Sequence, residues 1–264
     1  MTFKKIAVTV SLILIMLSQN VYSQRTKSSL SAGNQRRSEK SLKDNRYFFY
    51  FINTTVSNSG TEEEKKIFTE AVRRDILARM LYMKFAFNPA MTEIIRTQQL
   101  LIKLFSAVAL REIEDAKNLL NGNAPEILKF GCRSAKKYMS LGYRSIDWAR
   151  KVMIMSDNLP ENNYSIKLYE YVKAIKNAKY SKRYAIISLI ESRIPPEKRG
   201  RINYNKYKTV KELIEKYIQD REKYLFIHSD NFYKIVSSES VYDTIISSPE
   251  LDHIPEYEKY IKEN

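Results

Sequence analysis

Apolar residues recur every three or four positions over most of the chain after Thr61. This is the period of an amphipathic helix, whereas a half-buried strand alternates every second residue. The longest run begins at Asn88-Pro89, which predicts an N-cap and a first helical residue, and ends at Gly122. Such a helix would be roughly 45–50 Å long, and other helices must cover its wide apolar stripe. We therefore predict an all-α fold built around one long helix.

The chain contains few of the turn-forming residues that other fold classes need. The chain of 264 residues holds only 6 Gly and 7 Pro, too few for a sheet-rich protein or for the Gly-rich loops of an α/β nucleotide binder. The hydrophobic fraction of 44% and the charged fraction of 28% are typical of a globular chain. The composition therefore agrees with the helical periodicity.

The remaining helices are predicted from caps and breakers. Thr61 and Glu64 have the spacing of a capping box, which starts a helix over about 61–87. Trp148-Ala149 before Pro160 and Tyr184-Ala185 before Pro195 repeat at an offset of about 35 residues, near the period of tetratricopeptide hairpins. We expect helical hairpins packed as an elongated bundle or a short, weakly tetratricopeptide-like solenoid. The other predicted helices cover 123–142, 145–155, 164–178, 181–192 and 208–226.

The N-terminus has the pattern of a secretory signal peptide over 1–23, with cleavage between Ser23 and Gln24. Two lysines precede an apolar run of about a dozen residues, short of the ~20 that a membrane-spanning helix needs; an uncleaved membrane anchor is the alternative. After cleavage we expect no integral membrane segment. Residues 24–60 are predicted to be a flexible basic arm that includes 47–56 (YFFYFINTTV), either a strand or an aromatic plug on the helices. A helical domain over 61–227 and a tail over 228–264 with short helices would follow.

Charge and chemistry point to binding. The 45 Lys and Arg exceed the 30 Asp and Glu, so we expect acidic protein partners, anionic envelope polymers or lipid headgroups. The sequence shows no nucleic-acid module, no catalytic or cofactor motif, and too few His and Cys for a metal site. We therefore predict no catalytic residue, no cofactor, no metal and no nucleic-acid partner. The single Cys132 is predicted to be a buried apolar residue, with an intermolecular disulfide as the alternative.

Tyrosines beside Lys or Arg form the candidate interface. The chain has 19 Tyr, and many of them adjoin a base between 138 and 207. Tyr, Trp and Arg are enriched where protein surfaces meet, although such tyrosines are also common on half-buried helix rims. The predicted interface residues are Tyr143, Arg144, Trp148, Tyr164, Tyr169, Lys182, Arg183 and Tyr184.

Residues 138–195 resemble the helical core of the spirochaete flagellar coiling proteins. The matching elements are Asp157-Asn158-Leu159-Pro160, the stretch 164–173, and Lys182-Arg183-Tyr184-Ala185. The resemblance implies a non-enzymatic component of the sheath around the periplasmic flagellar filament, bound to filament and other sheath proteins. The strong positive charge and the aromatic run 47–56 do not match the family pattern.

Three functions follow from these observations. The first is an exported, periplasmic structural protein of the flagellar sheath. The second is a cell-envelope or cell-surface adhesin that uses a basic, Tyr-rich helical face. The third is a helical enzyme acting on cell-wall polymer, whose paired carboxylates could lie anywhere among the 30 acids.

Overall fold

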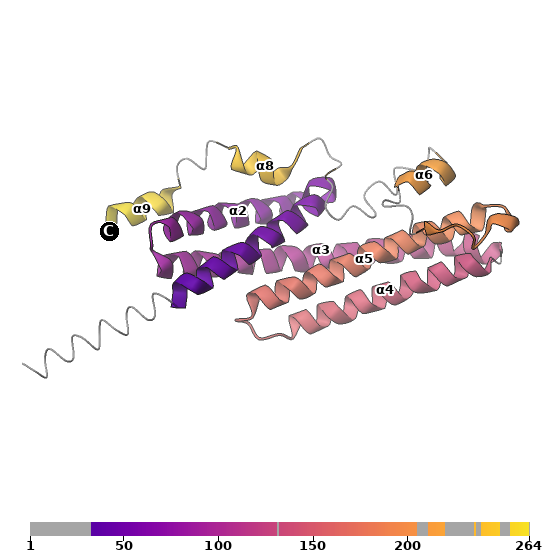
Figure 1. The fold of residues 1–264 in the computed structure, drawn as a ribbon, viewed down its shortest axis with the longest axis horizontal. Coiled ribbons are helices and arrows are strands. Elements are labelled where there is room, and N and C mark those ends of the chain that lie inside the picture. Colours follow the sequence, from indigo (N-terminus) through magenta and orange to yellow (C-terminus); the bar gives the residue numbers. More distant parts are fainter. Residues whose placement is uncertain are drawn as a thin grey trace, which may run out of the picture.

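A computed structural model describes residues 33–130, 132–204, 211–219, 235, 239–248 and 254–263. Their regular secondary structure is helical throughout, and these residues contain no strand, which confirms the all-α prediction (Figure 1). The signal peptide, its cleavage site at Ser23 and Gln24, and most of the second half of the predicted helix 208–226 lie outside the described residues.

One long helix runs through the whole bundle. Helix α3 (Phe87–Lys129) has 43 residues, which corresponds to about 65 Å of helix. Its first half packs with the helical segment 33–59 and with α2 (Glu62–Met83), and its second half packs with α4 (Arg133–Asp157) and α5 (Tyr164–Arg193) (Figure 1). The first part of α5 also reaches the N-terminal core, so the two halves form one elongated bundle.

The prediction of a flexible arm over 24–60 is wrong for residues 33–59, which form a helix, and residues 24–32 lie outside the described residues. The run 47–56 is not a strand; its aromatic side chains pack on other helices, as the alternative expected, and they do so as part of this helix. Phe48, Phe51, Ile52 and Val56 follow the helical period and are fully buried in the main core. The segment looked like a polar arm because its bases are exposed while its buried positions before Tyr47 are themselves polar, such as Asn45.

Two predicted helix boundaries near α2 had different outcomes. The capping box is confirmed: Thr61 Oγ1 accepts a hydrogen bond from the Glu64 amide at 3.2 Å, and the Glu64 carboxylate accepts one from the Thr61 amide at 3.0 Å. The predicted cap at Asn88 is wrong by two residues, because α3 begins at Phe87 with Ala86 as its N-cap. The chain reverses at Phe85, which has a positive φ of 61°.

The predicted helix end at Gly122 is also wrong, because α3 continues through Pro125 to Lys129. A proline removes one backbone hydrogen bond, and tertiary contacts offset that loss here. Ile127 is fully buried beyond the proline, and the guanidinium of Arg193 binds both carboxylate oxygens of Glu126 at 2.7 and 3.0 Å. Packing against α5 therefore holds the last turns of α3 in helical form.

The predicted breaks within 123–155 and 164–192 are absent, since α4 and α5 are each continuous. Gly142 does not end a helix. It is buried, and a Cβ atom at this position would lie only 2.8 Å from a methyl carbon of Leu120, so glycine lets α4 approach α3 closely. Trp148 and Tyr184 of the predicted repeat lie on these two long helices, so neither copy is a tetratricopeptide-like hairpin.

The C-terminal residues join the bundle as short helices, η1 (Pro196–Lys198), α6 (Lys211–Tyr217), α8 (Val241–Ile246) and α9 (Pro255–Glu263). Helix α8 lies across 33–59 and α2: Ser240 accepts a hydrogen bond from Asn53 at 3.0 Å, and Tyr242 packs on Phe49 and Phe68. Helix α9 packs near the end of α2. The described part of the predicted tail is thus attached to the core.

Two further observations concern membrane-spanning helices and the cysteine. Among the described helices, none combines the length and apolar character needed to cross a membrane. Cys132 is a free, buried residue that caps α4 and packs with Ile127 and Ala135. This placement confirms the prediction of a small buried residue and leaves the thiol inaccessible to a second chain.

Candidate partner-binding groove

An open groove of about 470 Å³ runs between α4 and α5. Trp148, the only tryptophan of the chain, stands on its α4 side with 55% of its surface exposed, and Tyr184 forms its α5 side. The α4 residues in the groove follow the helical spacing of one exposed face. The groove is lined by Leu141, Arg144, Ser145, Asp147, Trp148, Lys151, Asn177 and Tyr184.

A second depression of about 280 Å³ continues the groove toward the loop after η1, and the two share Tyr184. The ring of Tyr138 stacks with Tyr184 at 6.3 Å and meets the edge of Tyr204 at 5.5 Å between ring centroids. The lining residues are Tyr138, Tyr180, Arg183, Tyr184, Ile187, Ile202, Asn203 and Tyr204. We call the two depressions together the α4–α5 groove.

Glu191, a fully buried carboxylate of α5, fixes the loop end of this groove. It accepts hydrogen bonds from Tyr204 Oη at 2.5 Å, from the Gly200 amide at 2.8 Å and from Ser134 Oγ at 2.5 Å. Burial, followed by the Glu191 hydrogen bond and charge, strongly raises the pKa of Tyr204. Burial and the Glu191 charge also raise the pKa of Tyr138. Both phenols therefore stay neutral at physiological pH, and the loop is held rigidly against α5.

The groove lies beside an exposed basic face. Helix α4 carries six Lys and Arg against two Asp. None of these six bases forms a salt bridge with a residue that the structure describes, whereas the bases of α3 and α5 that line the bundle are paired. The six bases without a salt bridge to a described residue are Arg133, Lys136, Lys137, Arg144, Arg150 and Lys151. This face is free to attract an acidic partner.

The structure brings four of the eight predicted interface residues together. Arg144 and Trp148 lie on α4 and Arg183 and Tyr184 on α5, and all four line the groove. Lys151 and Tyr138, which were not among the predicted residues, complete it. The signal that could have found Lys151 is its helical spacing from Arg144 and Trp148, which requires an unbroken α4.

The other four predicted residues lie elsewhere. Tyr143 is half-buried and donates a hydrogen bond to Asn121 of α3 at 2.7 Å. Tyr169 stacks on Tyr47 and donates to Asp44 at 3.1 Å, and burial and Asp44 raise its pKa. Tyr164 is the first residue of α5, within weak hydrogen-bond distance of Gln99. Lys182 belongs to an internal ion-pair network.

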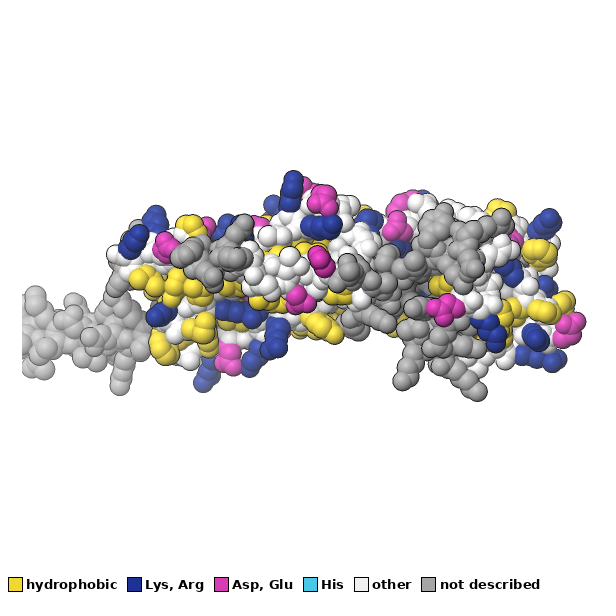
Figure 2. All heavy atoms as spheres, turned by 90° about the horizontal axis from the view of Figure 1, so that it is seen from above, with side chains coloured by type: hydrophobic (Ala, Val, Ile, Leu, Met, Phe, Trp, Pro, Cys, Tyr) yellow, Lys and Arg dark blue, Asp and Glu magenta, His cyan; other side chains and the backbone are white. Residues whose placement is uncertain are grey.

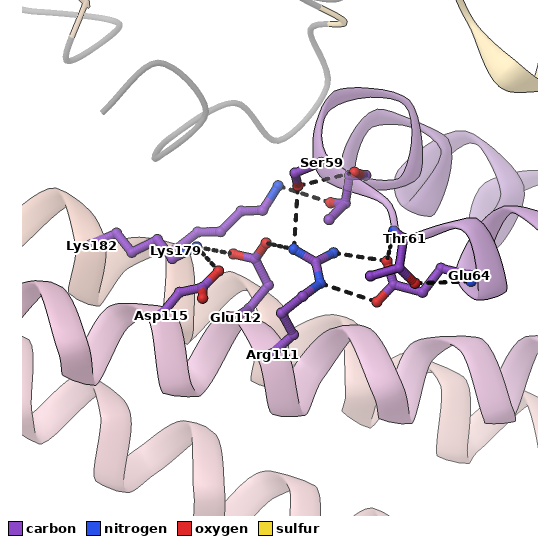
Figure 3. Close-up of polar contacts among 9 residues, drawn as sticks. Ser59, Thr61, Glu64, Arg111, Glu112, Asp115, Lys179 and Lys182 are labelled. Atoms are coloured by element: carbon purple, nitrogen blue, oxygen red, sulfur yellow. Dashed lines mark hydrogen bonds and ion pairs between the residues drawn. The ribbon is translucent and has the colours of Figure 1, made fainter. Parts of the chain in front are cut away.

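This network joins side chains of α2, α3, α5 and the segment 33–59, and Figure 3 shows its labelled members. Lys182 of α5 pairs with Glu112 at 3.0 Å and with Asp115 at 3.1 Å, both on α3. Beside Glu112, Arg111 binds both carboxylate oxygens of Glu64 on α2 at 3.1 Å. Lys179 is buried and donates to Thr55 Oγ1 of the segment 33–59 at 3.0 Å. Charge reversal at Lys182 would therefore damage the fold and cannot test an interface.

Glu112 stays ionised at the centre of this network. Burial alone would raise its pKa, but the charges of Lys182, Lys179 and Arg111 and the hydrogen bond from Lys182 together lower it below its ordinary value. The negative charge of Glu112 and the positive charges of its neighbours therefore stabilise one another. The network ties the N-terminal and C-terminal halves of the bundle together.

The described residues contain no group of three or more His, Cys, Asp or Glu that could hold a metal ion. Among the described residues that line the groove, Asp147 is the one acid, and Arg144, Lys151 and Arg183 are the bases. Its aromatic and basic side chains suit the binding of an acidic chain.

Comparison with known proteins places the chain in a family. The family described as "Surface protein adhesin OmpL37" matches residues 32–260, which is most of the chain. The chain belongs to the OmpL37 family. No curated protein and no solved structure matches it.

Membership of the OmpL37 family supports one of the sequence-based interpretations better than the others. It supports a protein of the cell surface or envelope, as both the first and the second hypotheses required. It gives no support to a flagellar coiling protein, a sheath or a role in motility, and it favours the alternative, a surface adhesin. The family description names an adhesin and no enzymatic activity.

Proposed function

We propose that this protein is a non-enzymatic surface adhesin that holds an acidic segment of a partner protein in the α4–α5 groove. The observation that carries the proposal is the coincidence of this groove with the exposed basic face of α4. The description of the OmpL37 family as surface adhesins supports the adhesive role.

The composition of the groove explains why an acidic protein segment suits it. Trp148, Tyr184 and Tyr138 offer large aromatic surfaces with few rotatable bonds, which is typical of residues that dominate protein interfaces. Arg144 can bind a carboxylate through two parallel hydrogen bonds, and Arg183, which also donates to the Tyr204 carbonyl at 3.5 Å, adds positive charge to the groove. The wider basic face of α4 would raise the association rate and make it sensitive to salt.

Trp148 makes the groove directly observable, because it is the only tryptophan and more than half exposed. We expect polyglutamate to change its fluorescence in a saturable way and the apparent affinity to fall as salt rises. The variant Arg144→Glu/Lys151→Glu should weaken polyglutamate binding by about tenfold or more, from the loss of two charge-assisted contacts. The same titration with dextran sulfate tests whether the groove binds an anionic polysaccharide.

A matched control separates the groove from net charge. The variant Lys40→Glu/Arg46→Glu changes two exposed bases of the segment 33–59 and alters the net charge by the same amount. It should bind polyglutamate almost as well as the wild type. Equal weakening by both double variants would mean that overall charge, not the groove, governs binding. Binding of dextran sulfate without binding of polyglutamate would replace the protein partner with a polysaccharide.

A further inference from the structure

The turn between α2 and α3 exposes apolar side chains at one end of the bundle. Phe85 is 79% exposed and Met83 is 68% exposed, the two highest values among the large apolar residues that the structure describes. Phe85 also has a positive φ of 61°, a conformation that favours glycine and strains a bulky side chain. The fold does not use the Phe85 ring for its core, so stability does not account for a phenylalanine here.

An aromatic cluster surrounds this turn. The ring of Phe85 lies edge-to-face with Phe87 at 6.2 Å between centroids, and Phe87 packs in the same way on Tyr82 at 5.4 Å. Helix α9 brings Tyr257 and Tyr260 to the same end, where they pack with Leu77 and Leu81 of α2. The turn is therefore a small apolar tip supported by aromatic side chains.

Bases surround the tip on its N-terminal side. Asn34 donates to Asn88 at 2.6 Å and Ser38 contacts Met91, which places the start of the segment 33–59 next to the turn. Residues 33–43 and 83–88 together hold five Lys and Arg, all exposed, and one acid, Glu39, which is paired with Lys43. Helix α9 adds two Lys and three Glu and so little net charge. Figure 2 shows hydrophobic side chains bordered by Lys and Arg at this end of the bundle.

We propose that this end of the bundle inserts into the interface of an anionic lipid bilayer, with Phe85 and Met83 at the boundary of headgroups and acyl chains. An aromatic and a thioether side chain surrounded by Lys and Arg match that boundary, where apolar groups leave water while cations contact lipid phosphates. Two protruding side chains cover far less area than the ~800 Å² per partner of a standard protein interface. Lipid is therefore the occupant that this surface fits.

Vesicle sedimentation of the full mature chain tests the proposal. We expect binding to vesicles of phosphatidylcholine with one-third phosphatidylglycerol, and weaker binding to phosphatidylcholine alone. Phe85→Ser should lower the partition coefficient by roughly tenfold, as expected for one large apolar side chain. Leu110→Ser changes a 55% exposed apolar residue in the middle of α3 and should leave vesicle binding unchanged.

The variant Phe85→Gly separates the loss of the apolar side chain from misfolding. Glycine relieves the positive φ, so this variant should melt at the same or a higher temperature than the wild type and still lose vesicle binding. A Phe85→Trp/Trp148→Phe variant carries its only tryptophan at the tip, and its emission should shift to the blue and be quenched by brominated lipids. Unchanged emission on bound vesicles, or equal binding by Phe85→Gly and the wild type, would overturn the proposal. Electrostatic attraction at the surface would then be the sole cause of vesicle binding.

Discussion

Glu112 holds the two halves of the bundle together, and replacing it with glutamine should lower the free energy of unfolding by about 3 kcal/mol. Its carboxylate lies 3.0 Å from Lys182 Nζ and 3.7 Å from Arg111, and its side chain is almost fully buried. Removing one partner of a buried ion pair costs about 3–5 kcal/mol because the other charge is left uncompensated. We expect the lower end of that range because Asp115 still pairs with Lys182 and Glu64 with Arg111.

Urea unfolding at pH 7 measures this loss, which is large against a total stability of about 5–15 kcal/mol for a typical domain. The pH dependence gives a second signature. Because the folded protein lowers the pKa of Glu112, its contribution is complete above the unfolded pKa of about 4.3 and is lost as the pH falls through the lower folded pKa. The difference in stability between wild type and variant should therefore narrow in acid.

Glu114→Gln provides the control. Glu114 is on the same helix but is 55% exposed and 3.5 Å from Lys117, and pairs of this kind contribute only about 0–1 kcal/mol. If Glu112→Gln were no more destabilising than Glu114→Gln, or if its effect did not change with pH, the network would not tie the halves together as we argue.

The remaining predictions concern stability. Gly142→Val should destabilise the fold by about 1–3 kcal/mol, because the valine side chain would meet Leu120. Gly122→Ala, at an open helical position, should stabilise the fold by about 1 kcal/mol. Thermal melts in which both variants shifted the melting temperature in the same direction would contradict the close approach of α3 and α4. Burial raises the pKa of Asp75, and Arg79 and Asn45 only partly oppose this, so its contribution is complete at low pH and is lost as the pH rises through the folded pKa. In urea unfolding, the free energy of unfolding of Asp75→Asn relative to the wild type should therefore rise between pH 3.5 and pH 7. For Glu112→Gln the same difference should fall as the pH rises. A difference for Asp75→Asn that did not change with pH would contradict a raised pKa of Asp75.

The fold class could be predicted from the sequence because the apolar period is local and strong. The capping box at Thr61 was predicted correctly for the same reason, since its donors and acceptors lie within four residues. The breaks predicted at Gly122 and Gly142 were wrong because their outcome depends on distant partners. Packing against α5 holds α3 together past Pro125, and Gly142 serves a contact with Leu120.

The segment 33–59 could not be predicted for a related reason. Its exposed bases and buried polar residues resemble a solvated arm, yet Asn45 is buried because it hydrogen-bonds Asp75 and Gln98 on two other helices, at 2.9 Å each. Such a chain of polar contacts exists only after the helices have packed. Local composition therefore gave the wrong answer there.

The groove was predicted in part. Residue type singled out Trp148, Arg144, Arg183 and Tyr184, because Trp, Tyr and Arg beside one another are typical of an interface, and all four line the groove. Adjacency in sequence does not give a shared face, however, since neighbours on a helix point about 100° apart. Tyr143 thus faces α3 although Arg144 lines the groove.

Adhesion by cells that carry the protein shows whether the α4–α5 groove binds an acidic partner at the cell surface. Cells producing the wild type, Arg144→Glu/Lys151→Glu or Lys40→Glu/Arg46→Glu would be compared on polyglutamate-coated surfaces, after surface protease digestion has shown equal display. We expect that only Arg144→Glu/Lys151→Glu loses adhesion and that added salt lowers adhesion by cells with the other two proteins. Equal adhesion by all three, or wild-type protein that the protease does not reach in intact cells, would contradict this expectation.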